Sequence, residues 1–182
     1  MSKAHDNIDS ALSSWIGKQR IFFVGSAPLA ATGHVNISPK GGEAFRILGP
    51  LEVVYQDYTG SGAETAAHLR ENGRIVILFC AFEGAPKIAR LHGTGTVITP
   101  GHPRYGELCL HFEDNPGTRA FVLVQVTRVS TSCGYSVPLF EFQGQRDVLD
   151  DWAKKQGPEG VKEYRQRKNQ RSIDGLPAFE GL

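Results

Sequence analysis

The sequence predicts a mainly β fold with flanking helices, arranged as a closed or split antiparallel barrel. Several short β-branched, aromatic or alternating segments are separated by turns rich in glycine and proline, as in all-β domains. Glycines interrupt the longest of these segments, and barrels use such bends to close. Helical periodicity is concentrated at the two ends of the chain, whereas a parallel α/β sheet would alternate strands with helices.

The first part of the chain predicts one helix and three strands. Apolar residues recur there at helical spacing, behind a capping Asp6 or Asn7, at Ile8, Leu12, Trp15 and Ile16. Short strands are predicted to follow over residues 21–24, 34–38 and 44–48. We expect Pro39 to end the second of them, because proline has no N–H to donate to a sheet.

The stretch Val53–Phe82 predicts a strand, a glycine-rich turn, a helix and a second strand. The turn is Thr59-Gly-Ser-Gly, and the helix covers residues 63–72, where alanine and leucine favour it. Gly73 is expected to close the helix in a left-handed conformation. The near-continuous apolar run over residues 75–79 predicts a strand that is buried on both faces.

The turn that opens this helix has two interpretations. A turn of glycine, serine and threonine exposes free N–H groups and the positive end of the helix dipole, which together bind phosphate. Alternatively, Ser61 and Glu64 form a capping box that satisfies those donors from within the chain. These residues alone favour the cap. Because Glu64 would repel an anion, a phosphate at this turn needs a cation from elsewhere in the chain.

The rest of the chain predicts two longer strands and a helical end. Residues 87–99 and 119–129 form the strands, residues 139–142 a short strand or turn, and helix begins near Arg146. Gly93 and Gly95 predict a bulge or bend in the first of these strands. We therefore expect a barrel domain with an N-terminal helix over residues 1–142. Residues 143–182 form a C-terminal helical extension that packs on the barrel or on a partner subunit.

Composition excludes several classes of function. The chain has 182 residues and a net charge of +1, and its late basic residues stand beside acidic ones, so nucleic acid is not an expected partner. Its cysteines, Cys80, Cys109 and Cys133, are odd in number and widely spaced, which argues against a disulfide framework and suits the cytoplasm. No apolar run is long enough to predict a membrane span.

Motifs for hydrolysis or metal binding are missing from the sequence. There is no Gly-x-Ser-x-Gly, no His-Glu-x-x-His and no Cys-x-x-Cys. Cys133 is more simply a small packed residue in a tight turn than a reactive thiol. The sequence therefore assigns neither a metal site nor a catalytic residue.

Lys40 is the cation that the glycine-rich turn needs. It follows a strand whose polar face carries Asn36 and Ser38, and it stands in a Pro-Lys-Gly turn. A lysine beside glycines can approach a phosphate as a point charge. An exposed turn lysine is the simpler interpretation when Lys40 is considered alone.

Three segments together resemble the pyridoxamine 5′-phosphate oxidase-like flavoproteins. They are Ile21-Phe-Phe-Val-Gly-Ser, Gly33-His-Val-Asn-Ile-Ser-Pro-Lys-Gly, and Asp57-Tyr-Thr-Gly-Ser-Gly with the helix that follows. The resemblance runs from about residue 16 to residue 129, and the order and spacing of the segments carry it. It implies an FMN-binding split β-barrel, which is a Greek-key antiparallel barrel. It also implies a homodimer with FMN at the subunit interface.

The resemblance also implies which residues hold the cofactor. Asn36, Ser38 and Lys40 match the strand that runs along the flavin and its phosphate. The turn and helix start that hold the phosphate correspond to Thr59, Gly60, Ser61 and Thr65. Arg90 lies in a strand that approaches the flavin from the other subunit, and it is the weakest of these matches.

The chain departs from the true oxidases of that family at two places. Glu64 and Thr65 stand where those enzymes carry an Arg-Lys pair, and the chain lacks their Arg-x-His motif near the C-terminus. We therefore expect an FMN-dependent oxidoreductase that acts on a small molecule other than pyridoxamine phosphate. The alternatives are a non-enzymatic flavin carrier or sensor, or a split-barrel protein that uses deazaflavin or haem. His34 and His92 are the candidate haem ligands.

Overall fold

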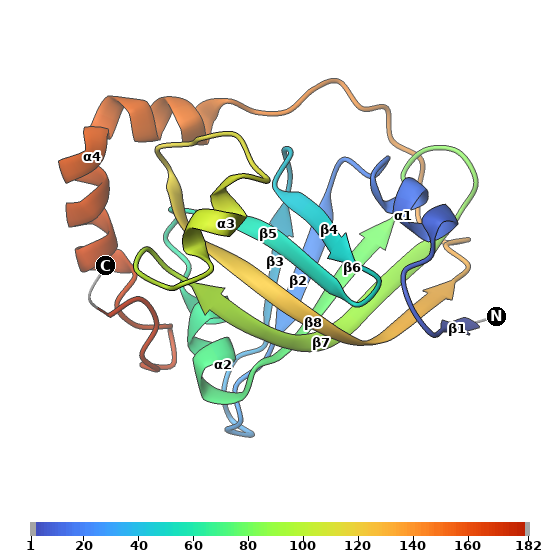
Figure 1. The fold of residues 1–182 in the computed structure, drawn as a ribbon, viewed down its shortest axis with the longest axis horizontal. Coiled ribbons are helices and arrows are strands. Elements are labelled where there is room, and N and C mark those ends of the chain that lie inside the picture. The colour runs from blue at the N-terminus through green and yellow to red at the C-terminus, as the bar shows by residue number, and fades with distance from the viewer. Residues whose placement is uncertain (1–2, 181–182) are drawn as a thin grey trace.

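The computed structural model describes residues 3–180, which form one antiparallel sheet with helices around it (Figure 1). The helices are α1 (Ser10–Ile16), α2 (Glu64–Asn72), α3 (Tyr105–Cys109) and α4 (Val148–Lys168). The strands are β1 (Lys3–His5), β2 (Phe22–Ser26), β3 (Asn36–Lys40), β4 (Phe45–Gly49), β5 (Glu52–Tyr58), β6 (Arg74–Cys80), β7 (Ile88–Ile98) and β8 (Thr118–Ser132). The predicted mainly β fold with flanking helices is confirmed.

The sheet curls around its core and leaves β3 and β4 as edges. Its order is β3-β2-β6-β7-β8-β5-β4, and β1 adds to β8. The strands β2 and β4 lie far apart in this order, yet the rings of Phe22 and Phe45 are 5.3 Å apart. Phe45 also lies 5.0 Å from Phe79 of β6. No backbone hydrogen bonds join β2 to β4 among the described strands. The aromatic side chains close the barrel between them instead.

The two faces of β2 and β3 have different characters. Asn36, Ser38 and Lys40 pair with alternate β2 residues that are buried, so these polar side chains face the inside of the barrel. Ile37 faces outward and is 70% exposed, as is its neighbour Val35 at 71%. The expectation that Pro39 ends this strand was wrong. Pro39 pairs with Phe23, and β3 is an edge strand, where a missing N–H costs little.

The strand β6 is buried on one face only. Ile75, Ile77 and Phe79 are buried in the core, whereas Val76 and Leu78 on the other face are only partly covered. The prediction of burial on both faces was therefore wrong. The partly covered face continues outward across β2 to Ile37, because Val76 pairs with Gly25 and Gly25 pairs with Ile37.

Two other glycines behave as the sequence predicts. Gly73 ends α2 with a φ of 71°, and the register of β7 against β8 shifts between His92 and Gly93. A Cβ on Gly93 would lie 2.2 Å from the backbone oxygen of Gln125, so only glycine fits this crossing. The bulge therefore lets β7 and β8 approach closely where they bend.

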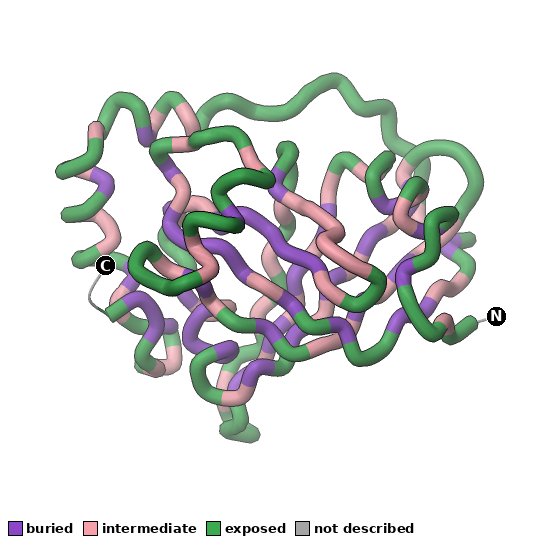
Figure 2. The backbone as a smooth tube through the Cα atoms, in the orientation of Figure 1, coloured by how far each residue is buried: buried purple, intermediate pink, exposed green. Residues whose placement is uncertain are grey.

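The ends of the chain differ most from the prediction. Strand β1 was not predicted, and the cap of α1 is Asp9, whose carboxylate accepts from the Leu12 N–H, in place of Asp6 or Asn7. Residues 139–142 form neither strand nor turn. They belong to an exposed segment that crosses the barrel to α4 (Figure 2). Helix α4 breaks at Gly157, just before Pro158.

Candidate functional site

A cavity of about 280 Å³ opens between β3, β5, β8 and the start of α2. Polar and charged side chains from each of these elements line it, and Phe179 closes it from the end of the chain. The lining polar residues are Ser38, Lys40, Tyr55, Asp57, Tyr58, Glu64, Thr65 and Arg119. Strand pairing brings them together, because β5 pairs with β8, and the curled sheet carries β3 across the barrel.

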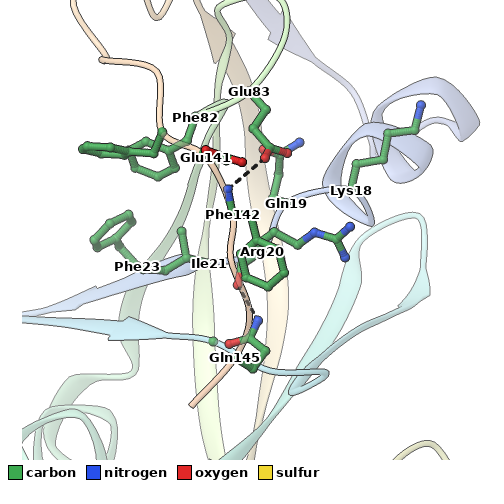
Figure 3. A pocket seen from close by; sticks show the side chains of 12 residues that line it. Lys18, Gln19, Arg20, Ile21, Phe23, Phe82, Glu83, Glu141, Phe142 and Gln145 are labelled. Atoms are coloured by element: carbon green, nitrogen blue, oxygen red, sulfur yellow. Dashed lines mark hydrogen bonds between the residues drawn. The ribbon is translucent and has the colours of Figure 1, made fainter.

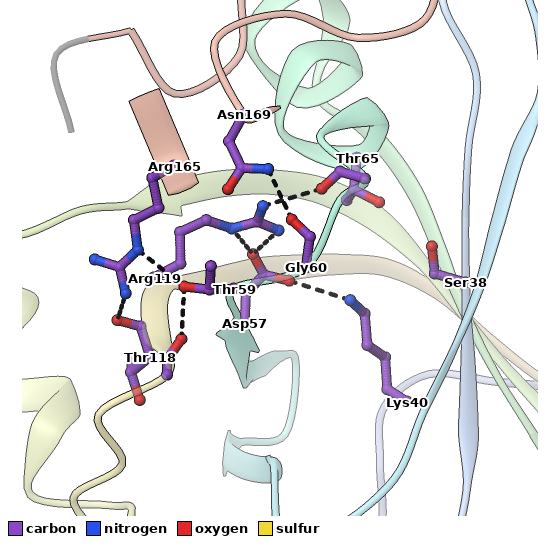
Figure 4. A network of polar contacts seen from close by, with 12 residues as sticks. Ser38, Lys40, Asp57, Thr59, Gly60, Thr65, Thr118, Arg119, Arg165 and Asn169 are labelled. Carbon is purple, nitrogen blue, oxygen red and sulfur yellow. Dashed lines mark hydrogen bonds and ion pairs between the residues drawn. The ribbon is translucent and has the colours of Figure 1, made fainter. Parts of the chain in front are cut away.

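Asp57 joins two cations in the wall of this cavity (Figure 4). Its Oδ1 accepts a hydrogen bond of 3.1 Å from Lys40 Nζ. Its Oδ2 accepts bonds of 2.9 and 2.7 Å from Nε and Nη2 of Arg119. The side chains of Arg119 and Asp57 are 5% and 6% exposed, so this ion pair is shielded from water.

The pKa of Asp57 shows which effect dominates in this network. Burial by itself raises the pKa of the carboxyl group, but the charges and hydrogen bonds of Arg119 and Lys40 outweigh burial and lower it. Asp57 is therefore ionised at neutral pH. Two cations against one carboxylate give the Asp57 network a net positive charge, which the Glu64 carboxylate in the same cavity wall offsets. The ring of Phe179 holds Arg119 in place, 4.2 Å from its guanidinium carbon.

The N-terminus of α2 lies in the wall of the same cavity. The capping box predicted for Ser61 and Glu64 is not formed: Ala63 is the N-cap, and no side chain within residues 3–180 caps it. The Glu64 carboxylate turns instead to the end of the chain, where it accepts from the Ile173 N–H at 3.3 Å. Ala63, Thr65 and Ala66 all line the cavity. The donors that a cap would satisfy thus remain available to a ligand.

The glycine-rich turn is held by the end of the chain (Figure 4). Thr59 is fully buried; its hydroxyl donates to the Gly117 carbonyl at 2.9 Å and accepts from Arg165 Nε at 2.8 Å. Asn169 donates to the Gly60 carbonyl at 2.7 Å. Burial lowers the pKa of Arg165, as does the nearby charge of Arg119. The segment around α4 therefore fixes the turn from outside the cavity.

The structure brings together most of the residues predicted to hold a cofactor. Ser38, Lys40, Gly60 and Thr65 line the cavity. Asn36 lies behind it, where it donates to Thr65 Oγ1 at 2.9 Å and accepts from Ser38 at 3.3 Å.

Three predicted residues are placed differently. Thr59 is buried beneath the turn, and Ser61 is exposed and is not among the residues that line the cavity. Arg90 lies on the outer face of the sheet, because it pairs with Leu78, which pairs with Phe23. It donates there to Ser132 at 3.0 Å. Arg90 therefore does not reach the cavity at Lys40 within its own chain.

Sequence reasoning missed Asp57, Arg119, Arg165 and Phe179. Arg119 carried a signal, since an arginine at the start of an apolar alternating strand is exceptional unless it is paired. Its partner Asp57 stands 62 positions earlier in the chain. Nothing in the local pattern around either residue indicates that the two meet.

The histidines do not form a metal centre. Among residues 3–180, no group of three histidine, cysteine or acidic side chains is placed to hold a metal ion. His34 pairs with Asp174 at 2.6 Å on the surface, and His92 lies on the outer face of the sheet. His68 is buried, its Nδ1 is 3.0 Å from Ser26 Oγ, and burial lowers its pKa. Its Nε2 has no partner among the described residues.

The comparison with known proteins places the chain in a family. It is 37% identical over 192 residues to the pyridoxamine 5′-phosphate oxidase family protein ustO of Aspergillus flavus, and the match covers 96% of this chain and 77% of that protein. The chain therefore belongs to the pyridoxamine 5′-phosphate oxidase family. No protein-family model matches the sequence.

Solved structures share the split-barrel fold. HupZ of Group A Streptococcus, as its H111A variant, superposes with a TM-score of 0.55 at 23% identity, covering 69% of this chain and 99% of that one. A putative pyridoxamine 5′-phosphate oxidase of Lactobacillus delbrueckii gives 0.53 at 13% identity and covers 70% and 98%. No helix within residues 3–180 is long and apolar enough to cross a bilayer.

Proposed function

We propose that this protein is an FMN-dependent oxidoreductase that acts on a small molecule, as a homodimer with flavin at the subunit interface. The observation that carries the proposal is the convergence of Lys40 and Arg119 on a cavity that receives the uncapped N-terminus of α2. Membership of the pyridoxamine 5′-phosphate oxidase family supports it. Bound flavin would supply the redox chemistry, and the protein would position it and its substrate.

The cavity has the chemistry that a phosphate group requires. Free N–H groups at a helix N-terminus and two nearby cations favour an anion. Lys40 is bound to Asp57 but keeps two further N–H donors, and its side chain is 22% exposed. Asp57 holds Lys40 and Arg119 at the wall of the cavity, so no large rearrangement is needed to meet a phosphate.

Glu64 is the side chain that opposes an anion here, since it lines the cavity while one of its carboxylate oxygens accepts from the Ile173 N–H. Lys40 stands on β3 and Arg119 on β8, whereas Glu64 stands at the start of α2, so the two cations and Glu64 do not compete for the same position. In this proposal, Arg119 and Lys40 take the place of the family's Arg-Lys pair at the helix start. Arg119 and Lys40 supply the charge that Glu64 and Thr65 do not.

The outer face of β3, β2 and β6 supports the homodimer. Val35 and Ile37 are exposed there beside Val76, around a groove of about 340 Å³. An apolar sheet face of this kind is normally covered by another protein surface. A second copy is the occupant that also gives Arg90 a role, since Arg90 lies on this same face and would approach the partner's flavin.

The direct test is to purify the protein, remove any ligand, and titrate the apoprotein with FMN while recording its visible spectrum and fluorescence. We expect saturable binding of one FMN per chain. FAD, deazaflavin and haem serve as competitors. A colourless protein that takes up no FMN contradicts the proposal, as does one that prefers haem. Turnover with nicotinamide donors then separates an oxidoreductase from a flavin carrier.

Lys40→Ala tests the phosphate site itself. Loss of one charge-assisted hydrogen bond is expected to weaken FMN binding by about tenfold to a hundredfold. Riboflavin, which lacks the phosphate, should bind the variant and the wild type equally. Lys162→Ala is the matched control, because that lysine is exposed on α4. Equal FMN affinity in the wild type, Lys40→Ala and Lys162→Ala would show that Lys40 does not contact the phosphate.

Ile37→Glu tests the homodimer. A carboxylate in the centre of the outer face is expected to give a monomer by light scattering, whereas Ile173→Glu, at another exposed isoleucine, should leave the dimer intact. FMN affinity should fall with dimerisation in the first variant. A wild-type monomer at all concentrations would contradict the interface.

A further inference from the structure

A second cavity, of about 460 Å³, lies beneath the segment that crosses from β8 to α4. Its walls come from the entry to β2, the end of β6 and residues 140–145. Among the described residues none lines both this cavity and the one at Lys40. The two are nevertheless neighbours, since Gly41 of this cavity follows Lys40 directly. It is a separate site beside the proposed flavin site.

Aromatic rings form most of its apolar surface. Phe82 and Phe140 lie with their ring centroids 5.3 Å apart, and Phe142 stacks under the guanidinium of Arg20 at 5.0 Å. Phe23 and Ile21 complete the apolar walls. Figure 3 shows Phe23 and Phe82 on one side of the crossing segment, with Phe142 and Arg20 on the other.

The crossing segment is held in place although it has no regular structure. The Phe140 N–H donates to the Phe82 carbonyl at 2.9 Å. The Phe142 N–H donates to Glu83 at 3.2 Å, and the Gln145 amide donates to the Arg20 carbonyl at 3.2 Å (Figure 3). Three hydrogen bonds over six residues thus fix a wall that would otherwise be free to collapse onto the barrel.

The rings held by this wall remain uncovered. Phe140 is 60% exposed and Phe142 is 40% exposed, although both stand on an anchored backbone. The cavity falls within the range of about 300–1,000 Å³ that is typical of small-molecule sites. A ligand that fills it would cover the parts of these rings that Phe82 and Arg20 leave exposed.

The charges around the cavity balance. Lys18 and Arg20 face Glu83 and Glu141, so the lining carries two cations and two carboxylates. Gln145 adds an amide whose oxygen lies so close to Gly41 that a Cβ there would meet it at 2.9 Å. Balanced charge, aromatic walls and one fixed amide select a flat, uncharged molecule with a single polar group.

We infer that this cavity binds a neutral planar aromatic small molecule, stacked against Phe82, Phe140 and Phe142 and oriented by Gln145. The binding site stands on the geometry alone. Only its role as the substrate site of the neighbouring flavin rests on the proposed function. In that role the cavity makes a neutral aromatic molecule the substrate class. This agrees with the chain's departures from the true oxidases, which argue against pyridoxamine phosphate.

Equilibrium dialysis of the full chain with 2-naphthol, a neutral fused aromatic alcohol, tests the inference. We expect saturable binding of one molecule per chain, and no saturable binding of 2-decalol, the saturated analogue with the same carbon skeleton. Phe140→Leu and Phe142→Leu should each weaken binding about threefold to tenfold, because each removes one aromatic contact and keeps apolar bulk. Phe112→Leu, in a different cavity, is the control and should not change it.

Four results would overturn the inference: no saturable binding, equal binding of 2-decalol, equal affinity in all variants, or competitive displacement of 2-naphthol by FMN. The last would mean that the cavity holds the flavin ring. Failure of the proposed function is distinguishable, since it leaves a chain that binds 2-naphthol and takes up no FMN. A dimer that dissociates in Phe140→Leu, with no 2-naphthol bound by the wild type, would show that a second copy fills the cavity.

Discussion

The two cavities are built in opposite ways. The cavity at Lys40 is set in the barrel: its cations are held by a buried carboxylate, and its turn is fixed by Thr59 from beneath. The cavity at Phe140 is set on the barrel, under an exposed segment attached by three hydrogen bonds. We therefore expect the first cavity to contribute to the stability of the fold and the second to contribute little.

Under the proposed function, this difference would let one fold keep a cofactor site and vary a ligand site. Lys40, Asp57 and Arg119 stand on strands whose pairing defines the barrel, so we expect a change among them to alter stability as well as binding. Residues of the aromatic cavity stand mainly on a surface segment, where substitutions cost little. We expect mutations to affect the two cavities separately, with a large loss of stability at the cavity near Lys40 and a small one at the aromatic cavity.

Arg119→Met should cause the largest loss. It leaves the Asp57 carboxylate buried with only Lys40 beside it, and breaking a buried ion pair costs about 3–5 kcal/mol of unfolding free energy. Urea denaturation measures this loss. Arg104→Met is the control, since Arg104 bridges Glu52 and Glu107 on the surface and such pairs contribute about 0–1 kcal/mol. Equal losses in the two variants would show that the buried network does not stabilise the barrel.

Thr59→Val should have an intermediate effect. The change keeps the shape of the side chain and removes the hydroxyl that joins Gly117 to Arg165. Loss of these hydrogen bonds is expected to cost about 1–3 kcal/mol. Hydrogen exchange should speed up first in residues near the end of α4, which the hydroxyl anchors. Unchanged exchange there would show that Asn169 and Gly60 hold the turn without Thr59.

His68→Gln should change how stability depends on pH. Burial lowers the pKa of His68 from 6.5, so the unfolded chain takes up a proton more readily than the folded one. The stability due to the neutral imidazole is therefore fully present above pH 6.5 and is lost as the pH falls below it. The variant should lack this loss when thermal unfolding is compared at pH 7 and in mild acid. If the wild type and His68→Gln lose stability equally in mild acid, groups other than His68 cause the pH dependence.

Phe140→Leu should have the smallest effect on stability. The ring is 60% exposed, and surface substitutions usually change the unfolding free energy by no more than about 0.5 kcal/mol. FMN affinity should also be unchanged, while 2-naphthol affinity falls. Thermal melts with and without each ligand measure all three quantities. A loss of stability comparable to that of Thr59→Val would show that the aromatic cavity contributes to the stability of the fold as much as the cavity at Lys40 does.

The sequence by itself determined most of the elements. Alternation and glycine breaks predicted the strands β2, β5, β6, β7 and β8, the left-handed Gly73 and the bulge at Gly93. These features depend on local conformation and on periodicity, which neighbouring residues encode. The sequence also predicted Lys40 as the cation near the glycine-rich turn, although that inference rested on the family resemblance, which sets the strand of Asn36 beside the turn.

The tertiary structure decided which interactions those elements make. The capping box failed because Glu64 found a partner at Ile173, and Pro39 stayed in a strand because β3 lies at the edge of the sheet. Asp57 meets Arg119 only because β5 pairs with β8, in a register that no local pattern reveals. Contacts between distant residues depend on topology and on burial. For this reason the sequence predicted the helix start as a candidate anion site, and only the fold showed the charges that surround it.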